Sequence, residues 1–194
     1  MQKPLITAPR PEDAEAWFDF LIEQQSITYE GVVRPDFAEV QGRHRDEWVP
    51  GLAAQFADPG TARFAVAKVE GRIVGLASAL DGPQAWEIEL GYTPSPAGRE
   101  LARLYVHPDH HGTGLAHDLF DAVDDGSDLY LWMISGNDRA RRFYERRGFV
   151  ALDESFNSGP SWGGVPMHRM VRRTPFTVGS GFDYGPSSYG EPTT

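Results

Sequence analysis

Apolar residues recur along the chain at spacings that separate helices from strands. A short strand is predicted over Pro4–Ala8, and a helix follows from Pro11, a residue suited to a first helical turn. One further helix is expected within Asp36–Phe56. The first helix has a buried stripe at helical spacing, formed by Trp17, Phe18, Leu21 and Ile22.

A hairpin and a long connection follow. Residues Arg63–Val69 alternate between two faces, Glu70-Gly71 is a tight-turn signal, and Arg72–Leu80 returns as the partner strand. The connection Asp81–Gly98 is rich in Gly and Pro but also holds large apolar side chains. We therefore expect a partly ordered insertion that covers a site.

The second half of the chain alternates strands with helices. The predicted strands are Glu100–His107, Asp128–Ile134, Phe149–Ser155 and Pro166–Val171. Helices are expected from Leu115 to Val123 and from an Asn137 cap to Gly148. This order of elements predicts an α/β fold in which helices surround one mixed sheet.

The composition belongs to a globular protein and excludes several partners and chemistries. Of the 194 residues 40% are hydrophobic, and 18 Lys and Arg against 28 Asp and Glu give a net charge of −10. A surface so negative disfavours binding to nucleic acid or to an anionic membrane. Cysteine is absent, which removes disulfides, thiolate metal sites and a cysteine nucleophile.

The domain organisation and location follow from the same survey. We expect a single domain over residues 1–173 and a flexible Gly/Pro/Ser-rich tail over residues 174–194. No signal peptide fits the start and no apolar run approaches the ~20 residues of a membrane span, so the expected location is the cytoplasm. Exposed final strands and apolar tail residues are compatible with a homodimer. These tail residues are Phe176, Phe182, Tyr184 and Tyr189.

A glycine loop between a strand and a helix is the first candidate for chemistry. The strand ends at Pro108, the chain turns at Gly112 and Gly114, and the next helix begins at once. Such a helix start offers unpaired N–H groups and a positive dipole end, which suit a phosphate. The nucleoside triphosphate loop requires Gly-Lys-Ser/Thr and the dinucleotide fingerprint requires three glycines and a later acidic residue. Neither pattern is present.

Two blocks of sequence, separated by one strand, have a recognisable pattern. His111-Gly112-Thr113-Gly114-Leu115-Ala116 maps onto Gln/Arg-x-x-Gly-x-Gly/Ala, and the segment from Asn137 to Phe149 maps onto Asn-x-x-Ala-x-x-Phe-Tyr-x-x-x-Gly-Phe. Together they resemble the GNAT superfamily of acyl-CoA-dependent N-acetyltransferases. The resemblance implies a mixed, mostly antiparallel central sheet that is flanked by helices and splayed at the acyl-CoA site.

The resemblance also implies which residues bind the cosubstrate, acetyl-CoA. The strand before the loop pairs its backbone with the pantetheine arm, and the Val106 N–H stabilises the oxyanion that develops on the thioester. Asn137 holds the arm from the other side. His111 replaces the usual Gln or Arg, so a pH-sensitive phosphate contact is expected there. The implied strand residues are Leu104, Tyr105 and Val106, and the implied pyrophosphate residues are Gly112, Thr113, Gly114, Leu115, Ala116 and His117.

Two residues are candidates for proton transfer. Tyr144 occupies the general-acid position of the family, from which it would return a proton to the departing thiolate, although it also lies on the buried stripe of its helix. Glu100 lies where many relatives keep a carboxylate base that acts through water, but it could equally be a surface residue at a strand edge. Glu87, Glu89 and simple desolvation of the amine remain alternatives.

The histidines and arginines near the two blocks require separate interpretations. His107, His110, His111 and His117 lie close together, but their spacing does not match a helical two-histidine metal site and no carboxylate triad accompanies them, so no metal is expected. A group of arginines is expected to form a solvated helix face, with contact to a CoA phosphate as the alternative. These are Arg139, Arg141, Arg142, Arg146 and Arg147.

The function expected from these features is transfer of an acetyl group from acetyl-CoA to a primary amine, by direct attack in a ternary complex. The acceptor would be a small-molecule or peptide amine that enters between the N-terminal helices and the insertion Trp86–Tyr92. A non-catalytic acyl-CoA-binding or sensor module is the alternative. A third possibility is a nucleotide-dependent enzyme, which would be stabilised by ATP or NAD instead of acetyl-CoA.

Overall fold

The computed structural model describes residues 3–174, and these residues form an eight-stranded mixed sheet. Along the sheet the strands follow the order β1-β2-β3-β4-β5-β8-β6, and β7 also pairs with β8. Every neighbouring pair is antiparallel except β4 and β5, which run parallel. The strands are β1 Leu5–Thr7, β2 Arg63–Val69, β3 Arg72–Asp81, β4 Arg99–Val106, β5 Leu129–Ile134, β6 Val150–Ala151, β7 Phe156–Asn157 and β8 Pro166–Arg172. This confirms the mixed, mostly antiparallel sheet that the resemblance implied.

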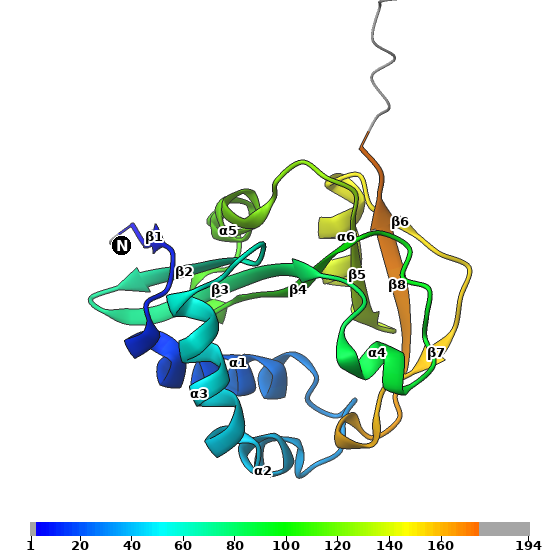
Figure 1. Cartoon of the computed structure of the whole chain (residues 1–194), viewed down its shortest axis with the longest axis horizontal. Helices are drawn as coiled ribbons and strands as arrows, with labels where there is room; N and C mark the ends of the chain where they lie inside the picture. The colour runs from blue at the N-terminus through cyan, green and yellow to red at the C-terminus, as the bar shows by residue number, and fades with distance from the viewer. Residues whose placement is uncertain (1–2, 175–194) are drawn as a thin grey trace, which may run out of the picture.

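Helices cover both faces of the sheet (Figure 1). Helices α1, α2 and α3 lie on one face, and α5 and α6 lie on the other. The helices are α1 Ala14–Thr28, α2 Phe37–Gly42, α3 Arg45–Ala57, α4 Ala85–Glu89, α5 Leu115–Val123 and α6 Asp138–Arg146. None of the helices within residues 3–174 combines the length and the apolar character needed to cross a membrane.

The hairpin predicted from alternation is confirmed. β2 ends at Val69 and β3 begins at Arg72, so its turn is Glu70-Gly71 as predicted. Glu70 and Gly71 both have positive φ, at 50° and 80°, as a two-residue turn between twisted strands requires. The two faces of β2 also separate as predicted. Ala65 and Ala67 pack in the core beneath α5, whereas Val66 packs in the core beneath α1.

The core beneath α5 depends on small residues in the sheet. Leu119 and Phe120 of α5 have no exposed surface, and they pack on alanines of β2 and β3. A Cβ added to Gly75 of β3 would lie 2.7 Å from Leu119 Cδ1. Glycine at this position therefore allows α5 to approach the sheet closely enough to bury its apolar face.

The single helix predicted within Asp36–Phe56 is wrong, because two helices occupy the segment. α2 ends at Gly42 and α3 begins at Arg45. Glycine is unfavourable inside a helix by roughly 1 kcal/mol, and the break lets the two aromatic ends face different partners. Phe37 packs on Trp162 with ring centroids 4.8 Å apart, and Phe56 packs on Trp17 at 5.2 Å.

The predicted strand Phe149–Ser155 is also largely wrong. Only β6, at Val150–Ala151, is extended and paired there, and β7 at Phe156–Asn157 was not predicted. Phe149 instead enters the core with 2% of its surface exposed, and Glu154 leaves the strand path to bind Arg169. The tail expected over residues 174–194 lies outside the described residues, apart from Thr174.

Candidate functional site

The parallel strands β4 and β5 pair only at their first residues and then part. The paired positions are Arg99 with Leu129 and Glu100 with Tyr130. On its other side β4 stays paired with β3 as far as Val106, with one extra residue at Ala102 where the register shifts. The prediction that the strand before the glycine loop is splayed from its neighbour is therefore confirmed.

The backbone of the C-terminal part of β4 is directed into this gap. The His107 N–H donates to Val74 O on β3 at 2.9 Å. Because backbone groups alternate in direction along a strand, the N–H and C=O groups of Leu104 and Val106 face away from β3, toward β5. Leu104 and Val106 thus direct their backbone groups into the space between the strands, whereas those of Tyr105 face β3.

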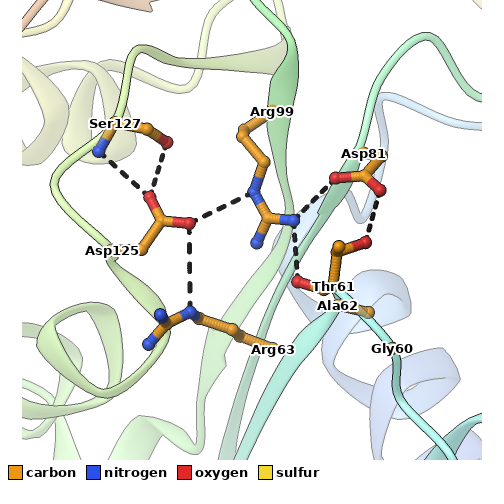
Figure 2. Close-up of a pocket in the computed structure, with 8 residues that line it drawn as sticks. All are labelled: Gly60, Thr61, Ala62, Arg63, Asp81, Arg99, Asp125 and Ser127. Atoms are coloured by element: carbon orange, nitrogen blue, oxygen red, sulfur yellow. Dashed lines mark hydrogen bonds and ion pairs between the residues drawn. The ribbon is translucent and has the colours of Figure 1, made fainter.

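The closed end of the gap is fixed by Arg99, the first residue of β4 (Figure 2). Its guanidinium lies 2.7 Å from Asp81 Oδ1 at the end of β3 and 3.5 Å from Asp125 Oδ2 before β5. Arg63 of β2 approaches the same Asp125 oxygen at 3.9 Å. These groups line a polar cavity of about 560 Å³, at the end of β4 opposite the glycine loop. Asp81 and Asp125 neutralise both arginines, and these ion pairs hold the strand ends together.

The glycine loop follows β4 at the open end of the gap. Gly112 and Gly114 have positive φ, at 77° and 91°, and a Cβ at either position would meet no atom within 4 Å. Among the hydrogen bonds of residues 3–174, none uses the N–H groups of residues 112–116. The first N–H used inside α5 is that of His117, which donates to Gly114 O at 2.9 Å. The series of free N–H groups thus ends at Ala116, and His117 does not extend it.

The His111 side chain connects the loop to β4 and to α6. Its Nε2 lies 2.8 Å from Val106 O, and its Nδ1 lies 2.8 Å from Arg139 NH1. Since Arg139 can only donate, Nδ1 accepts and Nε2–H donates to the carbonyl. Burial lowers the pKa of His111, and the charge of Arg139 lowers it further. The imidazole is therefore neutral at pH 7 and occupies the Val106 carbonyl.

Glu100 lies where the two strands separate and is buried, with 3% of its surface exposed. The interpretation of this residue as a surface glutamate at a strand edge is therefore wrong. Its Oε2 is buried and has no hydrogen-bond partner in the described structure. Burial raises the pKa of Glu100 to about 7, with a smaller rise from Glu87 and an opposing effect of Arg103. A carboxyl group with this pKa can accept a proton near neutrality.

Three tyrosines and Asn137 gather at the open part of the gap. The Tyr29 hydroxyl, at the end of α1, lies close enough to Tyr105, Tyr144 and Asn137 for all three to affect its pKa. Burial raises the pKa of Tyr144, and Tyr105 raises it further. Asn137 Oδ1 accepts from the Ala140 N–H at 3.1 Å and caps α6 as predicted, and the Asn137 side chain also interacts with the Tyr29 hydroxyl.

Sequence reasoning missed Tyr29 and used Tyr105 only for its backbone. Tyr29 stands 115 positions before Tyr144 and belongs to no motif. No local pattern could connect the two residues, because only the packing of α1 beneath β4 brings them together.

The remaining histidines and arginines lie near the two sequence blocks. In the described residues no three His, Asp or Glu side chains gather in an arrangement able to hold a metal ion. Arg139 is exposed as predicted and also donates to His111. The solvated arginine face is wrong for Arg147, which binds Asp121 at 2.6 Å and lies 4.8 Å over the Phe120 ring.

Comparison with solved structures identifies the fold as that of GNAT acetyltransferases. The PaiA N-acetyltransferase of Thermoplasma acidophilum, solved with coenzyme A, superposes with a TM-score of 0.64 at 16% identity, over 89% of this chain and 99% of that one. YncA of Salmonella typhimurium, described as an acetyltransferase with its cofactor acetyl-CoA, superposes with a TM-score of 0.58 at 16% identity, over 99% of both chains.

Sequence comparison agrees with the fold. Residues 60–151 match the family model described as an acetyltransferase (GNAT) domain. A protein of Mycobacterium bovis described as an uncharacterized N-acetyltransferase is 33% identical over 104 residues, which is 50% of this chain. The matched region spans 58% of that relative's length. Residues 60–151 of the chain are thus similar to the GNAT acetyltransferase domain.

Proposed function

We propose that the protein transfers an acetyl group from acetyl-CoA to a primary amine, by direct attack within a ternary complex. The observation that carries this proposal is the gap between β4 and β5. Unpaired strand backbone lines one side of the gap, five free N–H groups follow at its open end, and a buried carboxyl lies at its closed end. Similarity to GNAT proteins described with coenzyme A or acetyl-CoA supports the same function.

The cosubstrate would bind through backbone groups. Leu104 would pair with an amide group of the pantetheine arm, because the Val106 carbonyl already accepts from His111. The Asn137 amide nitrogen would donate to the arm from the opposite side. The N–H groups of Gly112, Thr113, Gly114, Leu115 and Ala116 would hold the pyrophosphate, helped by the positive end of the α5 dipole. The open space at Gly112 and Gly114 supports this assignment, because no side chain blocks the approach.

His111 would have an indirect part in this binding. It already donates to Val106 O and accepts from Arg139. It would therefore orient the end of β4 and hold Arg139 beside the loop. It would not bind the phosphate directly.

Acetyl-CoA supplies an acyl group activated as a thioester, and two side chains would move the protons. A primary ammonium group has a pKa near ~10.4 and must lose a proton before its nitrogen can attack. Glu100, at the closed end of the gap, would accept that proton through ordered water, because its pKa is raised to about 7. The Val106 N–H would stabilise the negative oxygen that forms when the new C–N bond is made.

Tyr144 would complete the reaction. As the C–S bond breaks, its hydroxyl would donate a proton to the thiolate, and the proton that the nitrogen loses on becoming an amide would restore the tyrosine. The net products are the acetylated amine, the free thiol of coenzyme A and one proton. Since the chain has no cysteine, the commonest acyl-enzyme nucleophile is absent and direct attack suffices.

Two measurements test the proposal. Calorimetry of the full chain with acetyl-CoA should give saturable binding, and incubation with acetyl-CoA and a panel of small-molecule and peptide amines should release free thiol. Acetyl-CoA binding without turnover for any amine would favour a binding or sensor module instead. No heat of binding at millimolar acetyl-CoA would overturn both functions.

A further inference from the structure

A second buried carboxyl, Glu87, lies in the connection between β3 and β4. It is carried by the short helix α4 and has no exposed surface. Its Oε1 accepts from the Tyr130 hydroxyl at 2.6 Å and from the Gln84 N–H at 2.8 Å. Its Oε2 is buried and lacks a hydrogen-bond partner in the described structure. A carboxyl so fully buried is rare in proteins unless a partner or a function requires it.

Tyr130 places this carboxyl beside Glu100. Tyr130 is the β5 residue directly opposite Glu100 in the last pair before the strands part. Both Glu87 and Glu100 act electrostatically on Tyr130, and Glu87 acts on Glu100. Two carboxyl groups, each with a buried oxygen that lacks a hydrogen-bond partner, thus neighbour one tyrosine at the closed end of the gap.

Few other ionisable groups contribute at this point. Arg103 of β4 acts on Glu100 with the opposite sign, but its NH1 donates to its own strand at Ala102 O. The β3 residue paired with Glu100 is Leu80, which carries no charge. Tyr130 is the titratable group that β5 presents. Glu87 is therefore the one acidic neighbour that acts on Glu100 among the described residues.

We propose that Glu87 is a positioning residue which, held in place by Tyr130, makes Glu100 a stronger base toward the acceptor ammonium. This inference rests on the proposed function. Two buried like charges oppose each other, and the unfavourable energy is relieved when one carboxyl group takes up a proton. The proton released by the acceptor would relieve it in this way. A base of higher proton affinity accepts the proton more completely in the transition state.

The test is a titration of the carboxyl groups themselves, which does not depend on turnover. Full-length protein labelled with ¹³C at glutamate carboxyls is titrated by NMR, and the Glu100→Gln variant identifies the Glu100 signal. In Glu87→Gln the midpoint of the Glu100 titration should fall by about one pH unit or more, as expected when a like charge is removed. Glu89→Gln is the matched control, because Glu89 is exposed on the same helix and its loss changes the net charge equally. In that variant the midpoint should stay within about 0.2 units of the wild type, because an exposed charge is screened.

The outcomes separate the two proposals. An unchanged Glu100 midpoint in folded Glu87→Gln overturns the role of Glu87, whether or not the protein is active. A lowered midpoint in a protein that acetylates no amine supports the interaction and counts against the proposed function. If Glu87→Gln does not fold, Glu87→Met, which removes the charge and retains the length, is titrated in its place. In active protein the acid limb of the kcat/KM profile should move with the NMR midpoint.

Discussion

Glu100 and Tyr130 are the last residues of β4 and β5 that pair before the strands separate. The Tyr130 hydroxyl donates to Glu87 at 2.6 Å. The point at which the sheet opens is therefore also the point at which its buried carboxyl groups meet. This coincidence joins a backbone feature, the gap, to a chemical feature, a buried carboxyl group whose pKa is raised to about 7.

Replacing Glu100 by Gln should abolish most of the activity without weakening cosubstrate binding. We expect kcat/KM to fall by about 10²- to 10⁴-fold, the range typical of a lost general base. In the wild type kcat/KM should rise with pH through about 7, because the carboxylate form of Glu100 is the base. Thiol release and calorimetry measure the two quantities. A comparable loss in Glu89→Gln would contradict the assignment.

The same substitution should stabilise the fold at alkaline pH. The pKa of Glu100 is raised from its ordinary 4.5 to about 7 on folding, so the folded state binds more protons than the unfolded state between these values. Ionised Glu100 therefore destabilises the folded state. This loss of folding free energy is absent well below pH 4.5 and is complete above pH 7, where it reaches on the order of 3 kcal/mol. Urea unfolding should show that Glu100→Gln gains more stability at pH 8 than at pH 5. An equal gain at both pH values would argue against the raised pKa.

Tyr144→Phe should lower kcat by roughly 10²-fold, as expected for a lost general acid, while the Kd for acetyl-CoA stays unchanged. Because burial raises the pKa of Tyr144, its hydroxyl keeps its proton at ordinary assay pH, so it should produce no alkaline limb below pH 10. Tyr92→Phe is the matched control, since its hydroxyl donates to Asn157 O at the edge of the sheet. Equal losses in both variants would show that removing any tyrosine hydroxyl disturbs the protein.

Gly82→Ala should disturb the closed end of the gap, whereas Gly98→Ala should not. A Cβ at Gly82 would lie 2.3 Å from the Tyr130 hydroxyl, but a Cβ at Gly98 meets nothing within 4 Å. Overpacking of this kind typically destabilises a fold by about 1–3 kcal/mol. Thermal or urea unfolding compares the two variants directly. A Gly82→Ala protein as stable as the wild type would show that Tyr130 can move away without loss.

His111→Gln should remove a pH dependence from acetyl-CoA binding. The pKa of His111 lies below its ordinary value, so the ring becomes charged only in mildly acid solution. Protonated Nδ1 can no longer accept from Arg139 and adds a positive charge beside the loop. Wild-type affinity for acetyl-CoA should therefore increase as the solution becomes more acid, at pH values below the ordinary 6.5 of a histidine, whereas the affinity of His111→Gln should change little. Calorimetry between pH 5 and pH 8 measures this, and identical profiles would count against the role of His111.

Much of the fold could be predicted because its signals are local. The alternation of β2, the Glu70-Gly71 turn and the Asn137 cap each depend on a few neighbouring residues. The break between α2 and α3 could not be predicted from periodicity, because it depends on which distant aromatic ring each helix meets. β7 was missed for a similar reason, since its two residues are extended only through pairing with β8.

The candidate site divides in the same way. The glycine loop and the strand before it belong to one contiguous motif, so their residues could be named in advance. The bond between Tyr130 and Glu87 joins positions 43 apart, and Tyr29 reaches the site from the opposite end of the domain's sequence. Burial of Glu100 could not be predicted for the same reason, since a glutamate at the start of a strand is usually exposed and its surroundings include strand β5, which follows much later in the sequence.

Arg99 is held by Asp81 on one side and by Asp125 on the other, so β4 and β5 are anchored at one end and separate at the other. These ion pairs restrain the walls of the gap, which then have little conformational freedom left to lose when a molecule enters. Association at such a gap depends on diffusion and fit more than on rearrangement. If the ion pairs of Arg99 were removed, the two strands would have to become ordered before the gap could bind a molecule.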